Sequence, residues 1–317
     1  MSLRTAARRA LVARRLFASS ARLTGTAATA DGAALAWAMH RPAAASTAPP
    51  LVVVSGWSGA VSDWGGLLSA LAHTGKRDVV AFSHRGMGAS TLGSDAKPTM
   101  ATFADDVSAV MRDANVADRA PHLLGVSMGG CAVQLVALDS GIELSSLTLG
   151  CTTHGGKTSV PPPSVAFFGA FKAWRDGDAA ARRACAEAFV LPGLPEAWQQ
   201  EGSAHRKLAS TFVEGFLETE RDADGLDRQL GALMRFSNAK RLAALADLPV
   251  HTITGDEDAV VPMGNSALMA AALRPGGEDG ALLRQTVRTG TGHLFWLVDP
   301  LDVVDDIAGF LADVDAQ

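Results

Sequence analysis

The feature that most constrains the fold is a series of short apolar runs separated by longer segments with a helical pattern. Seven runs are predicted strands, over Leu35–His40, Leu51–Ser55, Val79–Ser83, His122–Ser127, Ser146–Cys151, Val250–Thr254 and Leu283–Arg288. The main helical segments cover about residues 64–73, 101–114, 128–140, 239–246, 263–273 and 300–313. Runs such as LVVV are apolar throughout and β-branched, which is typical of strands buried on both faces of a parallel sheet. We therefore predict an α/β fold with a mostly parallel, doubly wound sheet.

One long segment interrupts this alternation. Between Thr152 and about Met234 there is no convincing strand pattern; the stretch opens with the loop-forming GGKTSVPPPS and continues with helical patterns. We predict a helical lid over 153–235, inserted between two strands of the sheet. The core is then composed of residues 31–152 and 236–317.

The first thirty residues have a different character. They contain six arginines, are rich in alanine, serine and threonine, and have no acidic residue before Asp31. Such a leader is typical of an organellar transit peptide, and RLFAS at 15–19 resembles a mitochondrial processing site. We predict that residues 1–30 are a cleavable transit peptide and that the protein is mitochondrial. A plastid protein and a cytoplasmic protein with a disordered basic tail are the alternatives.

Charge and composition exclude several partners. The net charge is −5, and no stripe of lysine and arginine lies in the body of the chain, so nucleic acid is not expected to bind. No apolar run reaches the length of about 18 residues that a membrane span needs. The three cysteines have no metal-ligand spacing, and no phosphate loop or dinucleotide fingerprint is found, so we expect no metal and no cofactor. The expected partner is a small molecule, and the oligomeric state stays open.

Residues 123–131, LLGVSMGGC, contain a G-x-S-x-G with Ser127 at its centre. The motif follows a predicted strand and precedes a predicted helix, which is the context of a nucleophile elbow. The flanking glycines allow a strained turn that lifts the Ser127 hydroxyl above the sheet. The backbone N–H of Met128, at the positive end of the helix, would then stabilise an oxyanion.

A base and an acid follow later in the chain. His293 lies after the last predicted strand, and Asp258 lies after the strand before it, with Asp256 and Glu257 as neighbouring alternatives. The order serine, acid, histidine is the order expected for a triad on this type of sheet. A serine hydroxyl is a weak nucleophile, so Ser127 needs His293 as its base, and a carboxylate must orient the imidazole.

The loop after LVVV supplies the remaining predicted site residues. Its glycines allow a tight turn, so the N–H of Trp57, or of Ser58, is the second expected oxyanion donor. We expect Trp57, Ser58, Met128 and His154 to contact substrate, in a pocket that lid aromatics make mostly apolar. His84, at another strand end, is expected to order a loop.

Together these motifs resemble the α/β-hydrolase family over residues 33–315. The matching pieces are SGWSG (55–59), SHRGMGAS (83–90), GVSMGG (125–130), GDEDAVVP (255–262) and GTGH (290–293). The resemblance is to the lidded branch, which includes 3-oxoadipate enol-lactonases, carboxylesterases, C–C bond hydrolases and cofactor-free haloperoxidases. It favours Asp258 as the acid of the triad. One departure is Ser55, where the family usually has a histidine that orders the oxyanion loop.

The resemblance and the residues imply a serine hydrolase that cleaves a carboxylic ester, thioester or lactone through an acyl-enzyme on Ser127. The same triad leaves C–C bond hydrolysis and acyl transfer to an acceptor other than water as alternatives. A different alternative is a non-catalytic protein of this fold that binds a small molecule.

Overall fold

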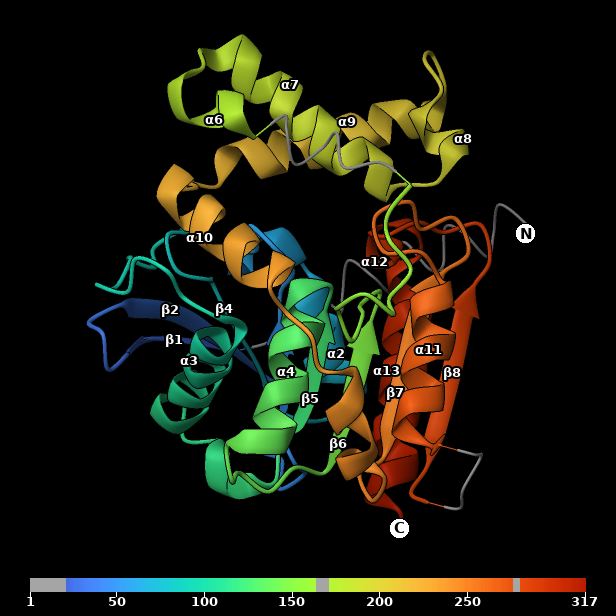
Figure 1. The fold of residues 1–317 in the computed structure, drawn as a ribbon. Coiled ribbons are helices and arrows are strands. Elements are labelled where there is room, and N and C mark those ends of the chain that lie inside the picture. Colours follow the sequence, from blue (N-terminus) through green and yellow to red (C-terminus); the bar gives the residue numbers. More distant parts are fainter. Residues whose placement is uncertain (1–20, 164–170, 276–279) are drawn as a thin grey trace.

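The computed structural model describes residues 21–163, 171–275 and 280–317 and is built on one eight-stranded sheet (Figure 1). Its strands are β1 (Ala21–Ala28), β2 (Ala34–Arg41), β3 (Leu51–Val54), β4 (Val79–Phe82), β5 (His122–Val126), β6 (Ser146–Gly150), β7 (Val250–Gly255) and β8 (Leu283–Arg288). They lie in the order β1-β2-β4-β3-β5-β6-β7-β8. The β1–β2 and β2–β4 pairs are antiparallel, and all other pairs are parallel. The predicted α/β fold with a mostly parallel sheet is confirmed.

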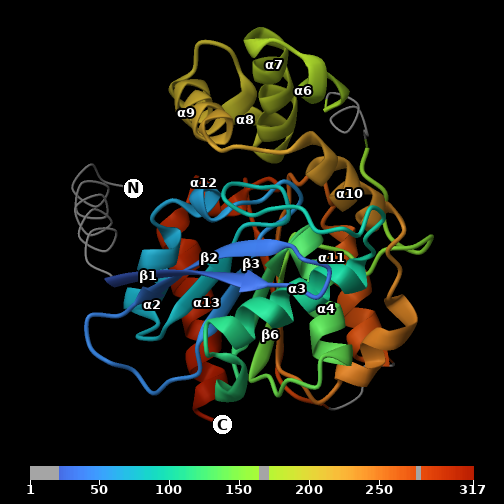
Figure 2. The ribbon, with the colours of Figure 1, turned by 90° about the vertical axis from the view of Figure 1, so that its left-hand side faces the viewer.

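Helices cover both faces of the sheet, as Figure 2 shows. Helices α3 (Met100–Asp113), α4 (Met128–Asp139) and α11 (Gly264–Leu273) lie on one face, and α2 (Leu67–Thr74) and α13 (Pro300–Asp315) lie on the other. Strand β3 shows why its sequence is apolar throughout. Val52 and Val54 pack toward α3 and α4, whereas Leu51 and Val53 pack toward α2 and α13. Successive side chains of a strand point to opposite faces, so both sets must be apolar.

The segment between β6 and β7 carries a group of helices that lies above the carboxyl ends of the parallel strands (Figure 1). These are α6 (Lys172–Asp176), α7 (Ala179–Val190), α8 (Glu196–Gln199), α9 (Ala204–Glu218) and α10 (Ala223–Met234), called the cap below. Side-chain caps begin the longer ones, since Asp178, Ser203 and Asp222 each accept a first-turn N–H. An aromatic cluster of Phe171 and Phe216 with Trp174 holds α6 against α9.

The sheet begins earlier than the sequence predicted. The leader was predicted to extend to residue 30, but Ala21–Ala28 form the edge strand β1, paired with β2 in full register. At one position of this strand, a tryptophan on the neighbouring strand fills the space that a side chain would need. A Cβ on Gly25 would lie 2.3 Å from the Trp37 ring, so glycine is required there. Residues 1–20 lie outside the described part of the chain.

Two further comparisons with the predicted elements are informative. Residues 239–246, predicted as a helix, form a 3₁₀ helix, η4 (Ala239–Leu245). Within the three described stretches of the chain, no helix is both long and apolar enough to cross a bilayer.

Arg85, after β4, forms two hydrogen bonds of 2.6 Å with the fully buried carboxylate of Asp106 and thereby fixes the loop that follows β4.

Candidate active site

Ser127 occupies a sharp turn between β5 and α4. Its φ is +53°, a left-handed conformation that costs a non-glycine residue about 1–2 kcal/mol. The glycines on either side leave no room for a side chain. A Cβ on Gly129 would lie 2.3 Å from the Val54 carbonyl oxygen, and a Cβ on Gly125 would lie 2.5 Å from the Gly129 carbonyl oxygen. The turn therefore has the geometry predicted from the G-x-S-x-G motif.

His293 and Asp258 form a buried hydrogen-bonded pair. The His293 Nδ1 lies 2.9 Å from Oδ2 and 3.1 Å from Oδ1 of Asp258. The N–H groups of Val260 and Val261 donate to the same carboxylate at 2.8 Å each and fix its orientation. Because an ionised carboxylate only accepts, Nδ1 donates, and the neutral ring keeps Nε2 as an acceptor. This is the tautomer that a general base requires.

The two alternative acids do not reach the histidine. Asp256 is exposed, and its carboxylate accepts the Gly290 N–H at 2.8 Å. Glu257 is also exposed, and its carboxylate accepts the N–H of Glu196 from the cap at 2.9 Å. Among the three neighbouring carboxylates, Asp258 is the one that the structure brings to His293.

Cys151, which the sequence reasoning did not select, lies beside this pair. The Cys151 Sγ, a carboxylate oxygen of Asp258 and a ring nitrogen of His293 all lie within 4.8 Å of one another. Burial raises the pKa of the Cys151 thiol, which is therefore uncharged at neutral pH. Burial lowers the pKa of His293, but its interactions with the Asp258 carboxylate and with Cys151 together outweigh burial and hold that pKa well above its ordinary value of about 6.5. The signal for Cys151 was its position at the carboxyl end of β6.

The raised pKa of His293 predicts the pH dependence of catalysis. The free imidazole is the base, so kcat/KM should rise with pH as His293 loses its proton. Since the Asp258 carboxylate raises the pKa, the midpoint of this rise is expected above pH 6.5. Initial rates on an ester substrate between pH 5 and 10 measure the midpoint. A midpoint below pH 6.5 would contradict the prediction.

The loop after β3, residues 55–59, is called the oxyanion loop. It lies against the nucleophile, since a Cβ on Gly56 would be 3.1 Å from the Ser127 Cβ. Met128 opens α4 directly after Ser127, and the first N–H groups of a helix have no partner within the helix. Ser58 is not available as a donor, because its N–H binds the Gln229 Oε1 at 2.9 Å. The N–H groups of Trp57 and Met128 stay the predicted pair of donors.

A histidine does order the oxyanion loop, although it comes from another strand. His84, after β4, is fully buried, and burial lowers its pKa to about 4, so the ring is neutral. Its Nε2 donates to the Ser55 carbonyl oxygen at 2.8 Å, as expected from its position at a strand end. The Ser55 hydroxyl in turn accepts the Trp64 indole N–H at 2.7 Å.

Ser127 and His293 share one cavity of about 1050 Å³ beneath the cap. Trp57, Ser58 and Met128, which were predicted to contact substrate, also line it. Most of the lining is apolar and comes from both core and cap, including Phe189, Val190, Phe212, Phe216, Leu233, Phe236, Val261, Leu294, Trp296 and Leu297. Volume and lining are those of a site for a small molecule with a sizeable apolar portion.

His154 was predicted to contact substrate, but it is not among the lining residues. Its side chain is 3% exposed, its Nδ1 lies 2.9 Å from the Gly155 carbonyl oxygen, and its own carbonyl accepts the Asn238 N–H. His154 is therefore held inside the loop that enters the cap. We correct the prediction on this point.

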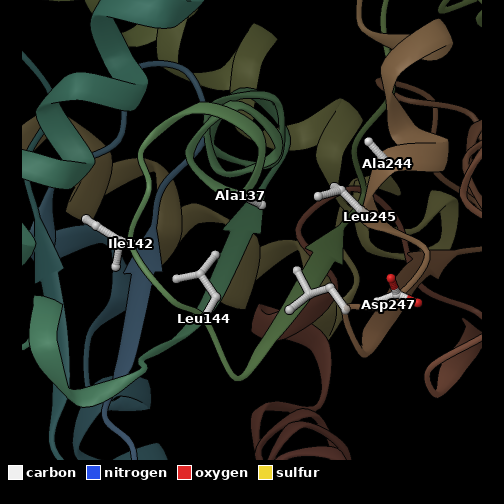
Figure 3. Close-up of a pocket in the computed structure, with 7 residues that line it drawn as sticks. Ala137, Ile142, Leu144, Ala244, Leu245 and Asp247 are labelled. Carbon is white, nitrogen blue, oxygen red and sulfur yellow. The ribbon is translucent and has the colours of Figure 1, made fainter.

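A second cavity, of about 250 Å³, lies near the amino ends of β6 and β7, at the opposite end of the strands from Ser127, and is shown in Figure 3. The described residues that line it are Ala137, Ile142, Leu144, Ala244, Leu245, Asp247 and Leu248. Ala137 lies in α4, Ala244 and Leu245 lie in η4, and the others lie in the loops that lead into β6 and β7. The cavity is thus far from the carboxyl ends of the strands, and Asp247 is the single titratable group among these residues.

Comparison with known proteins agrees with this geometry. Residues 51–307 match the model of the alpha/beta hydrolase family, so the chain belongs to that family. A search of the curated proteins finds no match.

Among solved structures, the fold is similar to that of a hydrolase from Pseudomonas aeruginosa PA01, with a TM-score of 0.72, 23% identity and coverage of 91% of this chain and 98% of that chain. It is also similar to a thermophilic esterase from Thermogutta terrifontis (TM-score 0.71, 20% identity, 93% and 99% covered). The enol-lactonase from Burkholderia xenovorans LB400 is a third example (TM-score 0.72, 20% identity, 91% and 100% covered). At sequence identities this low, the structural similarity shows a shared fold and nothing further.

Proposed function

We propose that this protein is a serine hydrolase that cleaves a carboxylic ester, thioester or lactone through an acyl-enzyme on Ser127. The observation that carries the proposal is that Ser127, on a strained elbow, shares one apolar cavity with His293, whose Nδ1 is bound to the buried carboxylate of Asp258. Nucleophile, base and orienting acid are the three parts that acyl transfer by a serine requires.

The reaction follows from these positions. The Ser127 Oγ attacks the substrate carbonyl carbon while His293 Nε2 takes the hydroxyl proton, and the N–H groups of Trp57 and Met128 stabilise the oxyanion. Collapse breaks the bond to the alcohol or thiol, which leaves with the proton from His293. Water then attacks the acyl-enzyme, with its proton passing to the same imidazole, and releases the acid and the free serine.

The cavity lining favours a substrate that is uncharged and partly apolar. Besides His293, the described lining residues include two charged side chains, Asp63 and Lys157. The Asp63 carboxylate is already paired with the Arg221 guanidinium at 2.7 Å, and Lys157 is exposed to solvent. A carboxylate on the substrate would therefore lose its hydration against apolar walls, and the described lining residues include no buried lysine or arginine to bind it.

The proposal is tested with a fluorophosphonate, which reacts with activated serines. We expect the folded wild-type protein to gain one adduct by intact mass, and the adduct to map to Ser127 in the tryptic peptide 120–157. Heat-denatured protein is the control and should gain none, because the hydroxyl is then not activated. A folded protein without an adduct, or with an adduct on another serine, would refute the proposal.

The apolar lining also predicts acyl-chain selectivity. Each buried methylene contributes about 0.8 kcal/mol, so kcat/KM for 4-nitrophenyl esters should rise about fourfold per carbon from acetate to hexanoate. The matched control is the 4-nitrophenyl monoester of adipic acid, whose terminal carboxylate should lower kcat/KM at least tenfold relative to hexanoate. Equal rates across the series would contradict an apolar acyl site.

We further propose that the arginine-rich leader directs the protein to the mitochondrion. The support is compositional, since the segment is rich in arginine and serine and has no acid before Asp31. Residues 1–30 fused to a fluorescent protein should give mitochondrial fluorescence in eukaryotic cells. Replacing all six arginines with glutamine should leave the fluorescence diffuse; diffuse fluorescence from the unaltered fusion would count against the proposal.

A further inference from the structure

The oxyanion loop is tied to one short part of the insertion, residues 219–229, called the tether segment. The Ser58 N–H donates to the Gln229 Oε1 at 2.9 Å, and the Arg221 Nε donates to the Ser58 carbonyl oxygen at 3.1 Å. The Trp57 indole N–H donates to the Leu226 carbonyl oxygen at 2.9 Å. The backbone N–H and the carbonyl of Ser58, and the indole of Trp57, are thus all hydrogen-bonded to the tether segment.

Gln229 is built as a cross-link between two core loops. Its side chain is fully buried on α10, and its Nε2 donates to the Arg85 carbonyl oxygen at 3.1 Å. Because a backbone N–H must donate and a carbonyl must accept, these two partners fix which end of the amide is which. Gln229 therefore joins the loop after β3 to the loop after β4 in one orientation.

Arg221 makes a second buried connection. Its guanidinium is fully buried, donates to the Thr219 carbonyl oxygen and to the Asp63 carboxylate, and stacks 3.6 Å from the centre of the Phe216 ring. Four partners with fixed geometry hold this side chain in place, so its Nε presents a rigid donor to Ser58.

These contacts hold a strained residue. Ser58 has φ +67°, which a side chain disfavours, and such a conformation persists only when the surroundings impose it. The Ser58 conformation sets the path of the chain beside Trp57, whose N–H is the predicted oxyanion donor. Gln229 has no place in the reaction itself, since its amide is engaged on both sides.

We infer that Gln229 and Arg221 are positioning residues that shape the oxyanion hole from the insertion. The inference rests on the proposed function. Without the Gln229 acceptor, the buried Ser58 N–H loses its partner, and the loop relaxes out of the left-handed conformation. The consequence is a loss of transition-state stabilisation rather than of substrate binding.

The test is Gln229→Met, which keeps the side-chain length and removes both hydrogen bonds. We expect kcat to fall about 10- to 100-fold with KM within about twofold, since losing an oxyanion donor outright costs about 10²–10³. The rate of fluorophosphonate labelling at Ser127 should fall in parallel. Gln229→Glu keeps an oxygen that accepts the Ser58 N–H, and its protonated carboxyl can donate to the Arg85 carbonyl oxygen, so this variant should retain kcat within about fivefold of wild type.

Gln134→Met is the matched control. Gln134 is also fully buried and donates to a loop carbonyl, that of Thr153 at 3.0 Å, and its amide oxygen accepts from Asn238 rather than from the oxyanion loop. Its variant should lose thermal stability and keep kcat. If Gln229→Met fails to fold, Arg221→Lys, which keeps the charge and removes the Nε donor, should lower kcat about tenfold at constant KM.

The outcomes separate the two proposals. Wild-type protein that forms the Ser127 adduct, together with a folded Gln229→Met variant of wild-type kcat or a variant that changes only KM, would overturn the inference and leave the hydrolase proposal standing. Wild-type protein that forms no adduct would overturn both. A fall in kcat shared by Gln134→Met would show a general effect of lost stability and would also overturn the inference.

Discussion

Ser127→Ala is expected to lower kcat for an ester substrate by about 10⁶-fold, the loss measured when the serine of a comparable triad is removed. The physical reason is that the variant has no nucleophile, while any residual rate comes from the oxyanion donors and binding alone. The fold should be unchanged, because alanine and serine are equally strained at φ +53° and the turn is shaped by Gly125 and Gly129. Steady-state kinetics and a thermal melt measure the two effects.

Ser140→Ala is the control for this variant. Ser140 ends the same helix, α4, at the opposite end from Ser127, and its hydroxyl accepts the Ile142 N–H. Its kcat should stay within about twofold of wild type. Retention of more than about one per cent of wild-type kcat by Ser127→Ala would remove Ser127 from the mechanism.

Asp258→Asn has the second largest expected effect, a fall in kcat of about 10⁴-fold. An asparagine amide can donate to Nδ1, which stabilises the tautomer that carries its proton on Nε2 and therefore cannot accept the serine proton. Removing the negative charge also lowers the pKa of His293, because the charge of the Asp258 carboxylate makes the largest of the contributions that raise it. The rising limb of the pH profile should thus move to lower pH in the variant.

The neighbouring carboxylate supplies a matched control. Asp256 lies two residues earlier, is exposed, and binds the Gly290 N–H instead of the histidine. Asp256→Asn should keep kcat within about threefold and leave the pH midpoint in place. If both variants lose activity equally, or if the midpoint of Asp258→Asn does not move, His293 is oriented by something other than Asp258.

Most of the sheet could be predicted from local sequence, because strands buried on two faces need apolar residues at every position. All seven predicted strands are present, and LVVV shows why, since its side chains alternate between two apolar layers. The strand that was missed, β1, lies at the sheet edge and consists mostly of small residues. Its Gly25 is required by the ring of Trp37, which lies beside it on the paired strand β2. A requirement imposed by a partner strand has no local signature.

The same distinction holds in the site. Ser127 follows β5 directly, and Asp258 and His293 lie in the loops that follow β7 and β8. Local motifs therefore located the residues that the structure brings to the carboxyl ends of the strands. His154 was misplaced because its burial depends on tertiary packing around Asn238. Gln229 had no signal, because its partner Ser58 lies 171 residues away along the chain.

The position of the tether segment has a consequence for how this enzyme scaffold can be diversified. The neighbouring strands β6 and β7 are joined by the stretch from Gly150 to Val250. The entropic cost of closing such a loop grows only with the logarithm of its length. The helices of the insertion are therefore exchangeable in principle. However, the backbones of Glu220 and Asp222 are hydrogen-bonded to the loop after β4, so this stretch is attached to the core. A chimera that keeps its rate should change at about residue 218, ahead of the tether segment, and leave the rest of the insertion native.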